Sequence, residues 1–378
     1  MWIRQDWLDA LGLEVPRTVE DLKKVAKAFV TQDPDGNGVA DTIGIIGAHN
    51  TGFLAEVGQN QYGFDAIFAS FGSFPRYWLK DDQGKVTFGS IMPETKEALA
   101  ELASMYKEGL IDPELLVRSD STEVVLSGKV GIFFGPWWSG YTIQDTLFDQ
   151  GINWQAYAVP LNKDGKFVTG MAAPTKQYIV VTKNCKNPEA ALKIINLLLR
   201  DEQKWIASGL KEKLNPSDCY PLFNVYDNAN EIEFSYDVLT KWMKNEITMD
   251  DIDFSTHKLL KNDMEVIKEL KKEPLDDYST KNWDLENEKA KSNMGRLVSI
   301  MVGERPLVEE GYERIYSVYY GQTESMASRW VNLEKLQEET FAKIILGQEP
   351  VDYFDEFVKN WLSQGGQDII NEITEVIQ

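Results

Sequence analysis

Four residues between positions 33 and 41 have oxygen-bearing side chains at a spacing suited to binding a metal ion. Asp33, Asp35, Asn37 and Asp41 supply oxygens at the first, third, fifth and ninth positions of a short loop, and Gly38 stands at the sixth. Hard oxygen ligands at this spacing wrap the cation in EF-hand-type calcium loops, where the glycine permits a sharp turn. The pattern therefore predicts a calcium site.

The rest of the loop departs from a calcium switch. Val39 stands at the seventh position, where a backbone carbonyl serves as ligand, and Thr42 or water would complete the shell. The twelfth position is Gly44, where an EF-hand has a bidentate Glu, and residues 43–46 read as a buried strand. We therefore expect a static, structural calcium ion. The alternative is a turn rich in Asp, Asn and Gly that binds no metal.

Aromatic residues after a strand form the second candidate site. Residues 130–134 read as a buried strand that ends at a Gly-Pro pair, and Trp137, Trp138 and Tyr141 follow directly. Ligands of α/β sheets bind beyond the carboxyl ends of strands, and indole faces suit stacking on the C–H faces of sugar rings. We expect at least one of these tryptophans to contact a ligand. The alternative is that both pack beneath a loop.

Three more aromatic residues are weaker candidates for ligand contact: Trp78, Tyr178 on a predicted strand, and Trp330 in a linker-like segment. Residues of this kind more often belong to a core or an interface. Catalytic constellations are poor, because the only histidines are His49 and His257 and no nucleophile or phosphate-loop motif occurs. With 60 acidic residues, however, a glycosidase carboxylate pair remains an open alternative.

Composition narrows the class of protein further. A length of 378 residues favours two domains, and the net charge of -21 argues against a nucleic-acid partner. No apolar run is long enough to span a bilayer, and the chain opens without a signal-peptide pattern. The two cysteines, Cys185 and Cys219, fit either one disulfide or two free thiols.

The elements that must position these residues alternate between helix and strand. A capping pair, Thr18 and Asp21, opens a predicted helix over 19–31, and helical spacing recurs at 93–109 and 188–199. Strands are predicted at 43–46, 130–134, 154–159 and 178–182. The second half reads as mostly helical, with helices at 232–243, 256–271, 333–346, 353–362 and 368–376. This mixture indicates an α/β fold.

With these residues in view, the chain resembles the extracellular carbohydrate-binding proteins of the LipO and alginate-binding type. These belong to the large solute-binding family that includes maltose-binding protein. The resemblance covers nearly the whole chain and lies in the order of several motifs, at residues 2–8, 33–42, 106–112, 131–138, 184–191, 341–345 and 354–358, and at Trp361 with Gly365-Gly366.

The resemblance implies a periplasmic-binding-protein-like (class II) α/β fold of two lobes that hold a sugar between them. It implies calcium at the Asp33 loop and sugar stacking at the Trp137-Trp138 turn. The expected protein is a non-enzymatic, monomeric binding component that delivers an oligosaccharide to the permease of an ABC transporter. It would be extracellular and anchored as a lipoprotein in its full-length form.

One departure concerns the first lobe. Family members carry a secretion signal, an anchor cysteine and most of the first lobe before the segment that matches Trp2. We therefore expect residues 1–170 and 240–378 to form the second lobe, and 171–239 to be a fragment of an incomplete first lobe. The alternatives are a calcium-stabilised polysaccharide-active enzyme and a truncated remnant that no longer holds sugar.

Overall fold

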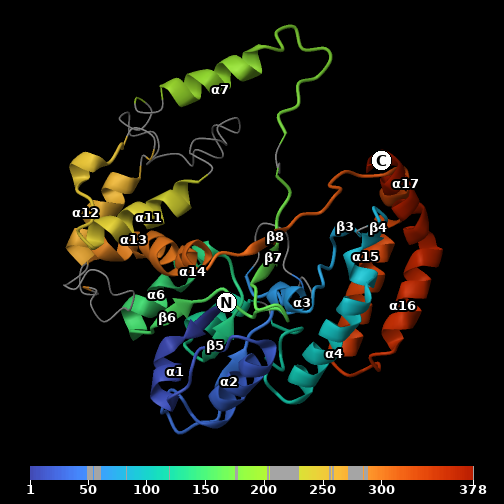
Figure 1. Ribbon diagram of the computed structural model, residues 1–378, viewed down its shortest axis with the longest axis horizontal. Coiled ribbons are helices and arrows are strands. Elements are labelled where there is room, and N and C mark those ends of the chain that lie inside the picture. The colour runs from blue at the N-terminus through green and yellow to red at the C-terminus, as the bar shows by residue number, and fades with distance from the viewer. Residues whose placement is uncertain are drawn as a thin grey trace.

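The computed structural model describes residues 1–48, 54, 61–81, 83–118, 120–174, 178–201, 204, 230–254, 257, 259–270, 284 and 288–377. A four-stranded sheet lies at its centre (Figure 1), in the order β2-β5-β1-β6. Its strands are β1 (Trp2–Arg4), β2 (Ile43–Ile45), β5 (Val130–Phe133) and β6 (Trp154–Ala156). β2 runs parallel to β5, and β1 runs antiparallel to both β5 and β6.

Neighbouring residues of β1 enter different cores, because successive side chains of a strand point to opposite faces. Ile3 belongs to one hydrophobic cluster together with α1 (Gln5–Leu11) and α2 (Val19–Thr31). The helix predicted over 19–31 is confirmed, and its capping box of Thr18 and Asp21 is present. Leu22, Val25 and Phe29 are buried along one face of α2, as its helical spacing requires.

The opposite face of the sheet carries a second cluster, which includes Trp2 and Phe133. A buried ion network stabilises this layer, because Arg296 donates to Asp263 at 2.8 Å and to Glu231 at 2.6 Å. The elements of this layer are α5 (Ser121–Leu126), η2 (Trp137–Ser139), α6 (Gly140–Gln150), α11 (Glu231–Met243), η3 (Met249–Asp251), α12 (Leu260–Leu270), α13 (Glu288–Val298), η5 (Ser299–Glu304) and α14 (Arg305–Glu309).

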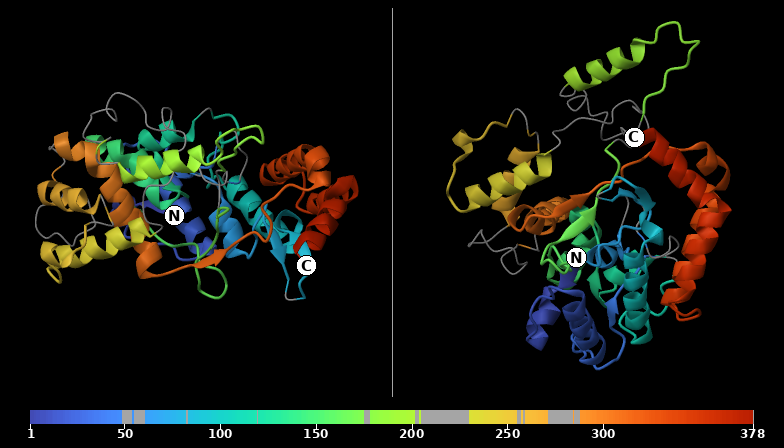
Figure 2. Two further views of the ribbon diagram at one scale, coloured as in Figure 1. Left: turned by 90° about the horizontal axis from the view of Figure 1, so that it is seen from above. Right: turned by 45° about the vertical axis from the view of Figure 1, so that its right-hand side comes forward.

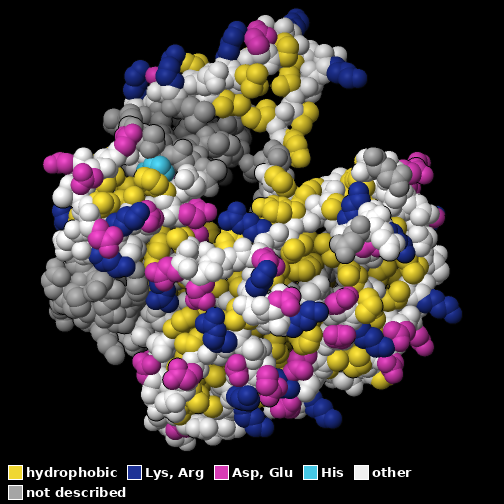
Figure 3. Space-filling view, in the orientation of Figure 1, with side chains coloured by type: hydrophobic (Ala, Val, Ile, Leu, Met, Phe, Trp, Pro, Cys, Tyr) yellow, Lys and Arg dark blue, Asp and Glu magenta, His cyan; other side chains and the backbone are white. Residues whose placement is uncertain are grey.

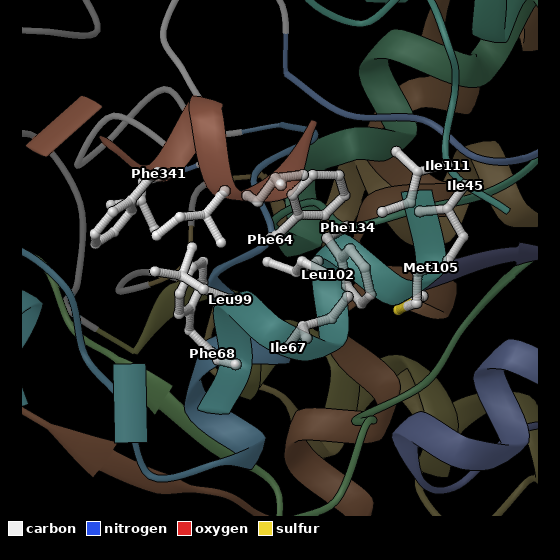
Figure 4. Close-up of a cluster of buried hydrophobic side chains, with 14 of the residues drawn as sticks. Ile45, Phe64, Ile67, Phe68, Leu99, Leu102, Met105, Ile111, Phe134 and Phe341 are labelled. Atoms are coloured by element: carbon white, nitrogen blue, oxygen red, sulfur yellow. The ribbon is translucent and has the colours of Figure 1, made fainter. Parts of the chain in front are cut away.

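The first cluster continues from the sheet into a group of C-terminal helices. Figure 4 shows Ile45 and Phe134 near the sheet in the same cluster as Leu99 and Phe341. The helices predicted at 353–362 and 368–376 are confirmed here, whereas the helix predicted at 333–346 begins earlier, at Glu324. The group comprises α3 (Asp65–Ser70), β3 (Trp78–Lys80), β4 (Val86–Phe88), η1 (Gly89–Ile91), α4 (Pro93–Lys107), α15 (Glu324–Ile345), α16 (Tyr353–Trp361), η6 (Leu362–Gly366) and α17 (Gln367–Ile377).

Two short parallel strands, β7 (Val168–Gly170) and β8 (Glu313–Ile315), pair with each other between the two helical groups (Figure 1). After β7 the chain leaves the packed body. Residues 178–200, which we call the arm, include α7 (Ala190–Arg200), and α7 stands apart in Figures 1 and 2. Parts of the fragment expected at 171–239, residues 175–177, 202–203 and 205–229, lie outside the described residues.

The arm exposes apolar side chains that would ordinarily be buried. Tyr178 is 77% exposed, Val180 83% and Leu192 66%, and Figure 3 shows hydrophobic side chains gathered along the arm. The strand predicted at 178–182 is wrong for this structure, because no described strand pairs with that segment. A strand needs hydrogen bonds from a neighbour, which alternating hydrophobicity cannot supply by itself.

Cys185 lies on the arm as an exposed free thiol, and Cys219 lies outside the described residues. Among the described helices, none is both long enough and apolar enough to cross a membrane.

Candidate functional site

Three adjoining cavities surround β7 where it lies between the two helical groups. The central cavity, of about 270 Å³, is lined by Asp65, Arg76, Tyr77, Gly135 and Gly170 among others. It shares Gly135 and Gly170 with a second cavity of about 260 Å³, which we call the turn cavity because Trp137 lines it. Because the two cavities share these residues, they lie next to each other beside the end of β5.

The aromatic cavity is the third and has a volume of about 430 Å³. It shares Arg76 and Tyr77 with the central cavity and Met171 with the turn cavity. Its remaining lining residues follow β7 and β8 or belong to β3 and α15: Trp78, Ala173, Ser317, Tyr319, Tyr320, Gly321, Gln322, Met326 and Trp330. Because β7 and β8 are parallel, the aromatic cavity lies beyond the carboxyl ends of both strands, where α/β sheets bind ligands.

The turn after β5 is held in place by close backbone contacts. The Trp2 indole N–H donates to the carbonyl of Pro136 at 3.1 Å. A Cβ on Gly303 would lie 2.1 Å from the carbonyl oxygen of Trp137, so η5 can approach the turn only with glycine there. Trp137 is half-buried and lines the turn cavity, whereas Trp138 is half-buried and does not line that cavity.

Trp78 and Trp330 pack against each other, although 252 positions separate them in the sequence. Their ring centroids are 5.9 Å apart, and Phe88 lies 4.7 Å from Trp78. Trp78 is only 4% exposed, so its ring is largely core. Trp330 lies within α15 and not in a linker, which corrects the sequence-based interpretation.

The two tyrosines predicted as ligand contacts lie apart from these cavities. Tyr141 is on α6 and 47% exposed, and Tyr178 is on the arm. Neither lines the central, turn or aromatic cavity. The structure instead brings Tyr77, Tyr319 and Tyr320 into the aromatic cavity, which sequence reasoning did not select. Tyr77 does stand between Pro75 and Trp78 in the sequence, so an aromatic cluster next to a proline was the available signal.

Close packing between two elements fixes the Tyr77 side chain. Its hydroxyl donates to the carbonyl of Met171 at 3.1 Å. A Cβ on Gly170 would lie 2.6 Å from the Tyr77 ring, so glycine in β7 allows the ring to sit there. Burial raises the pKa of Tyr77 above its ordinary range, so the hydroxyl remains a neutral hydrogen-bond donor at physiological pH.

The Asp33 loop folds so that its polar side chains face one another. The Asn37 amide donates to Asp35 at 2.8 Å and to Asp41 at 3.2 Å, and the Asp33 carboxylate accepts from the backbone of Gly38 at 2.9 Å. Asp33, Gly36 and Gly38 all have positive φ, at 45°, 68° and 77°, so the backbone turns sharply at three places. These hydrogen bonds hold the polar side chains of the loop close together.

The charges of the loop favour a cation. Partial burial and the hydrogen bond with Asp33 raise the pKa of Asp35, because two close carboxylates resist sharing negative charge. Val39 is 55% exposed, and Thr42 donates to the carbonyl of Phe29 at 2.7 Å. Within the described part of the chain, no set of three or more His, Cys, Asp or Glu side chains is arranged as a ready metal cluster. The loop does contain carboxylate, amide and carbonyl oxygens, which are the kind of ligand that calcium takes.

A buried carboxylate lies close to the junction with β8. Glu304, in η5, is only 5% exposed. Burial, and to a lesser extent repulsion by Glu233, raises its pKa to about 7, and Arg314 offsets part of this effect. Glu304 is therefore costly to ionise in the folded protein.

We expect Glu304→Gln to stabilise the protein at pH 8 by about 2 kcal/mol and to have little effect near pH 4.5. The pKa of Glu304 is raised on folding, so the free-energy cost of its ionisation in the folded protein is absent below the unfolded pKa. The cost grows as pH rises and is complete above the folded pKa of about 7. Urea unfolding at the two pH values measures the difference. The exposed Glu246→Gln is the control. Equal stabilisation by Glu304→Gln at both pH values would contradict the titration.

Comparison with known proteins shows which family the chain resembles. The family model described as "Bacterial extracellular solute-binding protein" matches residues 1–205, more than half of the chain. Lipoprotein LipO of Bacillus subtilis is 25% identical over 391 residues, covering 100% of this chain and 68% of its own length. The polygalacturonan/rhamnogalacturonan-binding protein YtcQ of the same organism is 24% identical over 386 residues, covering 100% of this chain and 67% of its own.

The fold also matches a solved structure. The substrate-binding protein FusA of Streptococcus pneumoniae, solved in complex with kestose, aligns with a TM-score of 0.58 at 17% identity. The alignment covers 100% of this chain and 71% of FusA. The periplasmic-binding-protein-like α/β fold predicted from the sequence is thereby confirmed.

Proposed function

Because the chain belongs to the family of bacterial extracellular solute-binding proteins, we propose that it captures an oligosaccharide and delivers it to the membrane permease of an ABC transporter. The observation that carries the sugar assignment is the group of adjoining cavities around β7, whose walls include Trp137, Tyr77 and Trp330. Such cavities combine flat apolar faces with a few polar groups, which suits a sugar ring.

The names of the relatives support a glycan as the ligand. YtcQ is named for binding polygalacturonan and rhamnogalacturonan, and FusA was solved with kestose. Polygalacturonan and rhamnogalacturonan are acidic and kestose is neutral, so the relatives leave the charge of this ligand open. Family membership favours binding without turnover over the alternative of a polysaccharide-active enzyme.

The division into lobes is part of the proposal. We assign residues 1–170 and 231–378 to one lobe and 171–230 to the other, in place of the boundary at 240 expected from the sequence, with the hinge after β7. The exposed apolar residues of the arm support this assignment, since a separate lobe would cover them. α11 packs in the core of the larger lobe through Tyr236 and Leu239, so we place the return to that lobe at Glu231. Ligand binding would then close the lobes around the hinge.

We also propose structural calcium in the Asp33 loop. Side-chain oxygens of Asp33, Asp35, Asn37 and Asp41, with the Val39 carbonyl, would hold the ion, and Thr42 or water would complete the shell. Support comes from the converging polar side chains and from a solved structure described as a FusA EF-hand mutant. The ion would neutralise the carboxylates and fix the connection between α2 and β2.

The family is extracellular, and LipO is a lipoprotein, so we propose a lipid-anchored extracellular protein in its full-length form. We expect a monomer, and the charge of -21 makes a nucleic-acid partner unsuitable.

We expect at least one class of oligosaccharide to raise the melting temperature of this protein, by an amount that grows with ligand concentration as linkage requires. A thermal-shift screen against plant and microbial oligosaccharides, with calcium present throughout, makes the measurement. The glycans are tested at concentrations up to 10 mM, roughly tenfold above a weak Kd of about 1 mM. A melting temperature that no glycan changes would contradict sugar binding and favour a remnant that no longer holds sugar.

A further inference from the structure

The described residues that line the aromatic cavity include one positively charged side chain and no negatively charged one. Its lining residues come from the loop before β3, the segments after β7 and β8, and α15, and Arg76 is the one formally charged residue among them. The remaining polar groups around the cavity are hydroxyls and amides, chiefly those of Tyr77, Tyr319 and Tyr320. A cavity of this composition favours a ligand that has both sugar-like surface and negative charge.

The backbone of Arg76 is held in a conformation that side chains rarely adopt. Its φ is 68°, in the left-handed region. The Arg76 N–H donates to the buried Ser90 hydroxyl at 2.7 Å, and the Gly89 N–H donates to the Tyr77 carbonyl at 2.7 Å. A Cβ on Gly89 would lie 1.9 Å from the Phe74 carbonyl oxygen, so this support is closely packed. Strain that the surrounding structure maintains is characteristic of ligand sites.

The guanidinium of Arg76 has donors to spare. One of its Nη atoms donates to Glu338 at 2.9 Å, and the Glu338 side chain is 49% exposed. The Arg76 Nε–H is buried and meets no hydrogen-bond acceptor in the described part of the chain. A half-exposed ion pair is weak, and a buried donor without a partner is unfavourable. Because Nε is buried, an incoming carboxylate would engage the outer nitrogens of the guanidinium, where it competes only with the half-exposed Glu338.

We propose that the aromatic cavity selects an acidic oligosaccharide and that Arg76 is the residue that recognises its carboxylate; this inference rests on the proposed function. The ligand class is a chain of uronic acid residues or one that contains them. The guanidinium would pair with a sugar carboxylate, Tyr319 and Tyr320 would meet the sugar hydroxyls, and Trp330 would supply an apolar face. The overall charge of -21 repels an anion, but salt and water screen the repulsion from distant charges. Arg76 would attract the carboxylate at contact distance, where screening is weaker.

The test is calorimetric titration of the calcium-loaded protein with tri- to pentasaccharides of galacturonate, glucuronate and mannuronate. Each is used in two forms, the free acid and the methyl ester, which share ring and linkage and differ in charge. Neutral fructo- and gluco-oligosaccharides complete the set. We expect one acid form to bind at least about tenfold more tightly than its ester. Arg76→Gln should weaken binding of that acid by about tenfold to hundredfold and change binding of the ester by less than about twofold.

Two further variants separate recognition from structural support. Arg17→Gln is the matched control, because Arg17 forms a similar exposed pair with Glu310, 3.5 Å away, and lies outside the aromatic cavity. It should leave both affinities unchanged. Glu338→Gln removes the partner of Arg76 and should leave acid binding intact or strengthen it.

The outcomes distinguish this inference from the proposed function. Equal binding of acid and ester, or an equal loss for both in Arg76→Gln, would overturn the role of Arg76. Binding of neutral glycans alone would overturn the acidic ligand class and leave the sugar-binding function standing. Binding of no glycan by the unaltered protein would overturn both.

Discussion

Removal of calcium by a chelator is expected to lower the melting temperature of this protein by about 5–10 °C. An ion that binds only the folded state stabilises it by about 4 kcal/mol when present at a thousandfold its Kd. In the Asp33 loop the ion would also relieve the repulsion between Asp33 and Asp35, whose contact raises the pKa of Asp35. Differential scanning fluorimetry with and without chelator, at constant ionic strength, gives the shift.

The variant Asp35→Ala should abolish this response, because it removes a ligand at the third position of the loop. Asp81→Ala is the matched control. Asp81 also accepts backbone hydrogen bonds within a surface turn, from Gln83 at 3.0 Å and Lys85 at 2.8 Å. If the unaltered protein melts at the same temperature in calcium and in chelator, the loop is a metal-free turn.

The pH dependence of the calcium-free protein offers a second readout of the same experiment. A raised pKa means that the folded loop holds its proton more tightly than the unfolded chain does. Ionisation of Asp35 therefore reduces stability as pH rises through the range of its titration. Calcium should remove this loss, so the benefit of calcium should be larger at pH 7 than at pH 4.

Trp137→Ala is expected to weaken glycan binding by about thirtyfold, the cost of roughly 2 kcal/mol that truncation of a buried contact tryptophan brings. Trp137 lines the turn cavity, and the Trp2 indole and Gly303 fix the turn that presents it. Removal of the indole would leave a sugar ring without its apolar partner. Isothermal titration with the ligand found in the thermal-shift screen measures the loss.

The adjacent Trp138→Ala is the control, since Trp138 is also half-buried but does not line the turn cavity. We expect its affinity to stay within about twofold of the unaltered protein. A loss in Trp138→Ala that equals the loss in Trp137→Ala would mean that the turn as a whole, and not the indole of Trp137, determines binding.

The features that the sequence predicted well depend on neighbours along the chain. The capping box of Thr18 and Asp21 and the spacing of Leu22, Val25 and Phe29 predicted α2, because a helix brings together residues three and four apart. A sharp polar turn is present at residues 33–41 as well, while the calcium ion expected there stays a prediction. α15 was predicted too short because its cap, Thr323, is followed by Met326 at the third helical position, where a capping box usually has Glu or Gln. Trp330 was therefore placed in a linker.

The features that only the tertiary structure decided depend on contacts between distant segments and on burial. Tyr77 meets Tyr319 and Tyr320 in one cavity only because β7 and β8 bring the segments that follow them to the same place. The left-handed backbone of Arg76 is set by Ser90, and the raised pKa of Glu304 by desolvation within η5. Local sequence determines which residues can cap, turn or alternate. It does not determine which distant residues exclude water together, and exclusion of water is what raises the pKa of Tyr77 and of Glu304.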